Sequence, residues 1–258
     1  MRLVASNRLS WAPQVASNVL CKELIRQTRR IVEIDVTSCR KKIRFPLGSP
    51  LRFGTPAYWI LQHRLHSENN SCPSFTLGND IYEETIACLL GGYGIPAEVG
   101  LAAFAALKRH GLTNPKSPAR EKDVLSILTK PFKVGRKFVR YRFPRQKAAR
   151  IAGAIQYFVK GKIPQKDPLT LRAWLIKIPG IGPKTASWIV RNSTGSNEVA
   201  IIDIHIRRAG IKAGFFLPNW EPSRHYLVME EAFLAFAKTA AVPAAELDSI
   251  MWLQMRSR

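Results

Sequence analysis

Two short segments near the start of the chain alternate apolar and polar residues, whereas most of the remainder repeats apolar positions at helical spacing. The alternation covers residues 30–36 (RIVEIDV) and 41–47 (KKIRFPL), and its period of two is typical of half-buried strands. We therefore predict two strands, paired as a small hairpin or sheet, at the N-terminal end of a mainly α protein.

Helical periodicity then predicts a succession of helices, and two of them have recognisable boundary residues. The first starts at Asp80, three residues before Glu83, an arrangement similar to a capping box. The next starts with Pro96 and ends at Gly111, and these residue types usually bound a helix. Further helices are predicted over residues 118–130, 143–161, 169–178, 183–192, 204–214, 221–239 and 243–256.

The length of the chain and its charge narrow the function. With 258 residues the chain can bury a sizeable core, in one large domain or two small ones. We divide it into an N-terminal segment with short strands, residues 1–54, and a helical region, residues 55–258. Forty Lys and Arg residues against eighteen Asp and Glu give a formal net charge of +22, which attracts polyanions. Nucleic acid is therefore the expected partner.

Other features of the composition bear on the class and location of the protein. No apolar run reaches the ~18 residues of a membrane span, so a soluble protein without membrane contact is expected. The four cysteines are scattered without a CxxC pair, which indicates free thiols in a reducing compartment and no metal site. The first thirty residues contain one acid beside several Arg and Ser, as in a transit peptide or in a basic helix of the folded protein. We expect a monomer, cytoplasmic and nucleoid-associated if bacterial; organellar or nuclear targeting stays open.

One stretch interrupts the helical pattern with helix-breaking residues: LIKIPGIGPKTASWIVRN, residues 175–192. We predict a helix, a tight turn and a second helix whose first residue is Pro183, where its fixed φ and missing N–H are tolerated. Gly180 and Gly182 let the turn adopt positive φ and let another backbone approach without an intervening Cβ. Because N–H groups at a helix start form an anion site, this helix hairpin, residues 169–192, is expected to hold a DNA phosphate.

The segments IPGIGPKTASWIV and AIIDIHIRR, residues 178–190 and 200–208, resemble the two signature segments of the helix-hairpin-helix DNA glycosylases. The resemblance implies two helical lobes that flank a cleft for duplex DNA. It also implies that Lys184 is the catalytic lysine of those members that cleave the DNA strand, and that Asp203 is the aspartate that assists it. The implied activity is that of a bifunctional DNA glycosylase and AP lyase of base excision repair, which needs no metal or organic cofactor.

The residues themselves are suited to this chemistry. A lysine is a good nucleophile only when its amine is neutral. The start of a helix, when shielded from water, favours the neutral amine, and Lys184 is predicted to lie at such a position. Asp203 precedes the helix over residues 204–214, so it can cap that helix and stay ionised. Its negative charge would stabilise the oxocarbenium-like transition state as the base of a flipped nucleotide departs. The expected mechanism is attack of Lys184 on the sugar, followed by a Schiff base and β-elimination.

Further DNA contacts are predicted from charge and from aromatic residues. Nine basic residues and no acid lie between Lys130 and Arg150, a pattern typical of phosphate contacts. Tyr93 lies between two glycines where the family presents a side chain that fills the gap left by the base; the alternative is a tyrosine packed under the turn. The basic run contains aromatic residues that either stack on bases or pack in the core, namely Phe132, Phe138, Tyr141 and Phe143. The residues selected as DNA contacts from this run are Arg140, Arg142, Arg145 and Lys147.

The C-terminal segment ELDSIMWLQMRS resembles the 8-oxoguanine branch of the family, so 8-oxoguanine is the favoured base. Trp188, Trp252 and Gln254 are the candidate pocket residues that would sandwich and hydrogen-bond a purine, with Trp252 in the core as the alternative. Trp188 stands where that branch has a smaller residue. An enzyme of the endonuclease III type, which removes oxidised pyrimidines, is therefore an alternative. Such an enzyme would lack an iron–sulfur cluster, because no cysteine follows Cys88. A glycosylase against modified foreign DNA and a non-catalytic DNA-binding hairpin are further alternatives.

Overall fold

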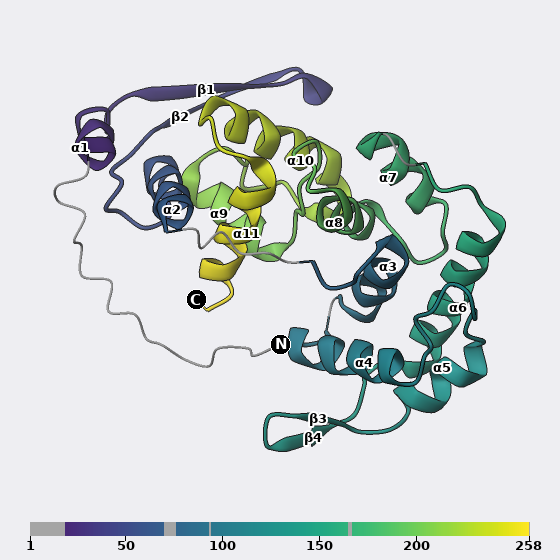
Figure 1. Ribbon diagram of the computed structural model, residues 1–258. Coiled ribbons are helices and arrows are strands. Elements are labelled where there is room, and N and C mark those ends of the chain that lie inside the picture. Colours follow the sequence, from purple (N-terminus) through teal and green to yellow (C-terminus); the bar gives the residue numbers. More distant parts are fainter. Residues whose placement is uncertain (1–18, 70–75, 93, 165–166, 258) are drawn as a thin grey trace.

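The chain forms two helical lobes, each with a small β-hairpin (Figure 1). The first lobe is built around a core that includes Leu107 and Ile151. Its helices are α3 (Ile81–Leu90), α4 (Ala97–Arg109), α5 (Glu121–Leu128), α6 (Pro144–Lys160), α7 (Pro168–Ile176) and α8 (Pro183–Thr194). The computed structural model describes residues 19–69, 76–92, 94–164 and 167–257. The prediction of a mainly α, two-lobed fold is confirmed.

The second lobe combines segments from both ends of the described chain. Phe215 and Phe236 stack in its core with ring centroids 4.5 Å apart, and Phe45 of the N-terminal hairpin contacts these rings at 6.2 and 6.1 Å. Its elements are α1 (Val19–Arg26), β1 (Ile31–Val36), the 3₁₀ turn η2 (Thr37–Cys39), β2 (Lys41–Pro46), α2 (Pro56–Glu68), α9 (Ile204–Ala213), α10 (Pro222–Thr239) and α11 (Ala244–Met255). The N-terminal strands and the C-terminal helices therefore share one core, and the predicted boundary at residue 54 does not separate two cores.

Strands β1 and β2 form the predicted hairpin. They pair antiparallel, with Ile34 opposite Ile43, and every second residue of β1 is buried. The alternation of the sequence therefore corresponds to one face on the core and one face in solvent, as expected for a half-buried strand.

A second hairpin, which was not predicted, follows α5. Strand β3 (Phe132–Val134) pairs with β4 (Lys137–Val139), and the turn contains Gly135 at φ +59°. Strands of three residues are too short for an alternating pattern to be recognised within a run of basic residues.

Buried polar contacts fix α8 against the second lobe. Glu230 on α10 accepts hydrogen bonds from Ser187 Oγ at 2.9 Å and from the backbone N–H of Ala200 at 3.0 Å. Arg191 on α8 forms an ion pair with Asp248 on α11, with an N–O distance of 3.0 Å. Removing one partner of such a contact leaves a buried charge without compensation, which is strongly unfavourable. The end of α8 and the segment that leads into α9 therefore keep one relative position.

Candidate active site

Helices α7 and α8 form the predicted helix hairpin. Asp167 caps α7 by accepting a hydrogen bond from the Thr170 N–H at 2.7 Å, and Pro183 is the first residue of α8. Gly180 in the turn has φ +92°, the left-handed backbone that was predicted. Gly182 differs from the prediction, because its φ is −94° and it serves as the N-cap of α8. A Cβ at Gly182 would meet no atom within 4 Å, so the space beside this helix start is open.

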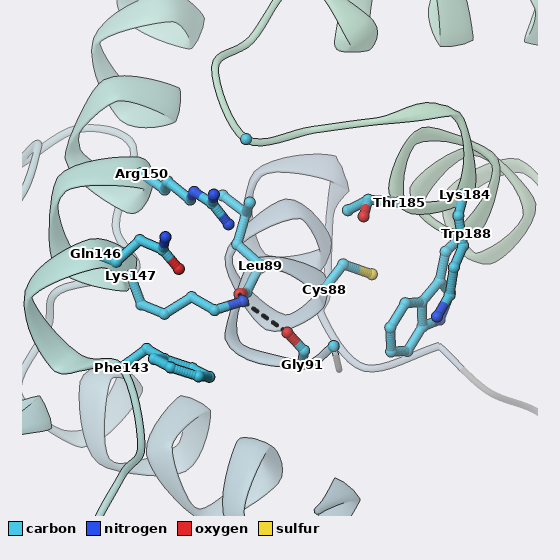
Figure 2. A pocket seen from close by; sticks show the side chains of 12 residues that line it. Cys88, Leu89, Gly91, Phe143, Gln146, Lys147, Arg150, Lys184, Thr185 and Trp188 are labelled. Atoms are coloured by element: carbon cyan, nitrogen blue, oxygen red, sulfur yellow. Dashed lines mark hydrogen bonds between the residues drawn. The ribbon is translucent and has the colours of Figure 1, made fainter. Parts of the chain in front are cut away.

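A cavity of about 270 Å³ opens between α3, α6 and α8, and Lys184 lines it (Figure 2). Lys184 is the second residue of α8 and is half-buried. Trp188 lies one turn further along α8 on the same wall, and a Cβ at Gly91 would lie only 3.2 Å from its ring. Gly180 also lines the cavity. Gly180, Lys184 and Trp188, all predicted for the site, therefore meet at one cavity.

The opposite wall of the cavity comes from α6, which the sequence pattern did not assign to the base-removal site. Phe143, Gln146, Lys147 and Arg150 line this wall, and intervals of three and four residues place side chains on one face of a helix. Figure 2 shows them across the cavity from α8. The spacing is visible in the sequence, but the sequence does not show which helix faces Lys184.

Lys147 is buried in this wall, with 7% of its surface exposed. Its Nζ donates hydrogen bonds to the carbonyl oxygens of Leu89 at 2.5 Å and Gly91 at 2.7 Å, at the C-terminal end of α3. Burial, with a smaller effect from the charge of Arg150, lowers the pKa of Lys147 to about 8. The ammonium group therefore holds the loop after α3. It is not free to bind a phosphate, although the sequence predicts Lys147 as a DNA contact.

The pH dependence of stability should report on this buried amine. The folded-state pKa of Lys147, about 8, lies below the ordinary lysine value, so the unfolded chain binds more protons between the two values. The contribution of Lys147 to stability therefore rises with pH through that range. Relative to Lys147→Met, we expect the wild type to gain free energy of unfolding between about pH 7 and about pH 10, measured by urea denaturation. A difference that stays constant with pH would contradict the lowered pKa.

Asp203 begins α9 as its N-cap, as predicted. Its Oδ1 accepts hydrogen bonds from the N–H groups of His205 at 2.8 Å and Ile206 at 2.9 Å. The backbone just before it is held by Tyr226, whose hydroxyl donates to the carbonyl of Ala200 at 2.7 Å. Asp203 belongs to the second lobe and lies outside the cavity wall, and the fixed connection to α8 sets its position relative to the hairpin.

The predicted base pocket is not assembled around this cavity. Trp252 packs edge-on against the His205 ring on the second lobe, with centroids 6.4 Å apart. Both ends of the Gln254 amide are bonded to side chains of α2, at 2.6 and 2.7 Å, so this residue joins α11 to α2. Of the three predicted pocket residues, only Trp188 lines the cavity.

The predicted arginine contacts lie on the surface of the first lobe. Arg140, Arg142 and Arg145 are all exposed, and the Arg142 guanidinium lies 5.0 Å from the centre of the Phe143 ring. Tyr93, the predicted gap-filling residue, lies outside the described residues. Arg142 is therefore placed next to the α6 wall of the cavity.

The charged side chains that line the cavity are all basic: Lys147, Arg150 and Lys184. A concave surface with this charge favours an anion such as a phosphate and disfavours a metal cation. Among the described residues, no three His, Cys, Asp or Glu side chains gather where a metal ion could bind. No helix in the described part of the chain has the length and apolar character to cross a membrane.

Two features of the site, together with a family comparison, give the class of the protein. A lysine at the start of the second hairpin helix, followed by an aspartate that caps the next helix, is the arrangement of a helix-hairpin-helix DNA glycosylase. A sequence model described as 8-oxoguanine DNA glycosylase matches residues 74–242, which is more than half of the chain. The chain belongs to the 8-oxoguanine DNA glycosylase family.

Relatives in sequence agree with this membership, and solved structures share the fold. A protein of Metallosphaera sedula, named 8-oxoguanine DNA glycosylase/AP lyase, is 33% identical over 121 residues, which are 43% of this chain and 57% of that protein. The fold is shared with the 8-oxoguanine DNA glycosylase of Thermotoga maritima at a TM-score of 0.58 and 24% identity, over 79% of this chain and 98% of that one. The fold is also shared with the 8-oxoguanine glycosylase/lyase of Methanocaldococcus jannaschii, which was solved with 15mer DNA containing 8-oxoguanine. The TM-score is 0.57 and the identity is 23%, over 76% of this chain and 97% of that one.

Proposed function

We propose that this protein excises 8-oxoguanine from duplex DNA and then cleaves the strand at the abasic site. The observation that carries the proposal is the position of Lys184, an amine at the start of α8 on a cavity whose charged side chains are all basic. A lysine amine can displace a group from carbon and remain attached as a Schiff base. The names of the relatives, 8-oxoguanine DNA glycosylase/AP lyase, support both the substrate and the pair of activities.

In the proposed reaction the target nucleotide first leaves the base stack, because its glycosidic carbon is inaccessible inside a duplex. The neutral amine of Lys184 forms a bond to C1′ while the bond from C1′ to the base nitrogen breaks. The base leaves with that electron pair and takes up a proton. The amine then loses a proton, and the C1′–O4′ bond breaks as O4′ takes up a proton, so the sugar ring opens and an imine joins Lys184 to C1′. Loss of a C2′ proton expels the 3′ phosphate, which breaks the strand, and water finally releases the amine.

Asp203 would supply the fixed negative charge for this reaction. Positive charge develops on the sugar as the base departs, and a preorganised carboxylate stabilises that charge more than mobile water does. The two N–H groups bonded to Oδ1 hold the carboxylate in one orientation. Asp203 therefore acts in the proposed mechanism through its charge, and not as a second nucleophile.

The size of the cavity is consistent with one flipped nucleotide. At about 270 Å³ it lies just below the usual range of ligand pockets, which is about 300–1,000 Å³. Trp188 provides a flat aromatic surface in its wall, and such surfaces stack on extruded bases. One base with its sugar therefore suits this space better than a longer oligonucleotide.

A panel of duplexes, each with one modified base, tests the proposal. The panel contains 8-oxoguanine, thymine glycol, other oxidised pyrimidines, modified bases of the kind found in foreign DNA, and an undamaged control. Base release and strand cleavage are scored separately. We expect both from 8-oxoguanine. Faster release of oxidised pyrimidines would favour an activity of the endonuclease III type, and release only of foreign modifications would favour a defence enzyme. Salt-dependent binding without any release would favour a non-catalytic DNA-binding protein.

Two glycine substitutions should separate fold stability from phosphate binding. Because Gly180 has φ +92°, Gly180→Ala should lower the free energy of unfolding by about 1–2 kcal/mol. Gly182 has φ −94° and open space at its Cβ position, so Gly182→Ala should lower stability only through the lower preference for alanine at an N-cap, by about 0.5–1 kcal/mol. The new methyl group would stand at the helix start where a phosphate binds, and we expect about tenfold weaker duplex binding in fluorescence anisotropy. Wild-type affinity in Gly182→Ala would contradict the phosphate site.

A further inference from the structure

The hairpin of β3 and β4, residues 132–139, extends from the first lobe beside α4 (Figure 1). Its aromatic residues have opposite environments. Phe132 is only 6% exposed and packs edge-on against Tyr141, with ring centroids 6.3 Å apart. Phe138 is 74% exposed and pairs in register with Lys133 on the other strand. One ring therefore anchors the hairpin in the core, and the other is presented to the surroundings.

The surface around Phe138 is basic. No acidic residue lies between residues 130 and 150. The basic residues of the hairpin and its flanks are all exposed, namely Lys130, Lys133, Arg136, Lys137 and Arg140. None of these five forms an ion pair with another described residue. Nucleic acid offers both phosphates for such cations and apolar sugar and base surfaces for an exposed ring, so it matches this surface in charge and in its apolar contact.

The hairpin is also continuous with the cavity. The buried hydroxyl of Tyr141 donates to the carbonyl of Leu90 at 2.5 Å, which ties the base of the hairpin to the end of α3. Phe143, which lines the cavity, follows Phe138 by five positions. At about 3.3 Å per residue this separation spans at most about 17 Å. Since phosphates of one strand are about 3.4 Å apart along the duplex axis, Phe138 lies within about five base pairs of a nucleotide in the cavity.

We infer that this hairpin is a second DNA contact, which grips the duplex on one side of the damaged base. The basic residues neutralise phosphates, and Phe138 packs against sugars and base edges in the minor groove, where apolar side chains act as wedges. The inference rests on the proposed function for its partner, the duplex that carries the damaged base. It adds a contact several base pairs away from the one made by the α7–α8 hairpin.

Duplexes with unequal arms test this inference. The probe carries a tetrahydrofuran abasic-site analogue, and either arm is shortened from about ten base pairs to about three, which is less than the estimated reach of about five base pairs. The wild type should lose affinity when one particular arm is shortened and not when the other is. Phe138→Ala should bind the full duplex about five- to a hundredfold more weakly and should be insensitive to the shortened arm. The matched control is Leu227→Ala, which removes an exposed apolar side chain from α10 of the second lobe. It should behave as the wild type.

The salt dependence of binding gives an independent measurement. Changing Arg136 and Lys137 together to glutamine should reduce the slope of log Kd against log salt by about one for each lost phosphate contact. Wild-type affinity of Phe138→Ala on every probe, or a loss that is independent of arm length, would overturn the inference. So would self-association of the wild type that Phe138→Ala abolishes, because a second copy would then cover the hairpin. A wild type that binds with arm dependence but releases no 8-oxoguanine would refute only the proposed activity.

Discussion

A Lys184→Gln variant should form no covalent adduct with 8-oxoguanine DNA under borohydride, and it should release the base at least about 10³-fold more slowly than the wild type. Glutamine is polar and of similar reach, but its amide nitrogen cannot form an imine with the sugar. Lys184 is only half-buried at the start of α8, so the fold should tolerate the change. The adduct is detected as a protein–DNA band on a denaturing gel, and the rate is measured in single turnover.

The matched control for this variant is Lys177→Gln. Lys177 belongs to the same hairpin, where it is the exposed C-cap of α7, and its variant should retain the adduct. Undiminished trapping in Lys184→Gln would refute its role as nucleophile. In that case Lys147, which shares the cavity, would be the next lysine to test.

An Asp203→Asn variant should slow base release by about 10²–10³-fold while its stability stays close to that of the wild type. Asparagine caps a helix about as well as aspartate does, so the hydrogen bonds from His205 and Ile206 can persist. What the variant loses is the negative charge that stabilises the developing positive charge on the sugar. Single-turnover release from 8-oxoguanine DNA at saturating protein measures this loss.

Asp167→Asn is the matched control for the capping role. Asp167 caps α7 in the same way, through the Thr170 N–H, but its charge is not assigned to the reaction. We expect both variants to keep the melting temperature and only Asp203→Asn to lose rate. Equal rates in the two variants would show that the charge of Asp203 is not needed, and a parallel fall in rate and melting temperature would reduce its role to capping.

Features that depend on a few neighbouring residues could be predicted from the sequence. The hairpin follows from Gly180 and Pro183 within one turn, and the capping by Asp203 follows from its place immediately before a helix. Strand β1 follows from an uninterrupted alternation over six residues. The left-handed φ predicted for Gly182 was wrong, because an N-cap needs only an extended backbone. The absence of a side chain at Gly182 leaves open space beside the start of α8.

Features that depend on packing between distant segments could not be predicted. Arg145 and Lys147 are two positions apart in one basic run, but one is exposed and the other is buried with its amine on the carbonyls of α3. The difference depends on which face of α6 meets α3, and local sequence does not show this. Gln254, a predicted pocket residue, joins α11 to α2 because the N-terminal part of the chain packs on the C-terminal helices. Local sequence does not show this packing either.

The shared core of the second lobe also has a consequence for synthesis of the chain. The core of the first lobe is contiguous in sequence, so it can form while the ribosome is still translating, whereas Phe45 must wait for Phe215 and Phe236. At about 5–20 residues per second this delay lasts roughly ten to forty seconds, during which the apolar face of β1 and β2 lacks its partners from the C-terminal helices. We therefore expect nascent chains to aggregate at this hairpin unless a chaperone covers it, and a defect at Phe45 to reduce the yield of folded protein before it affects the chemistry at Lys184.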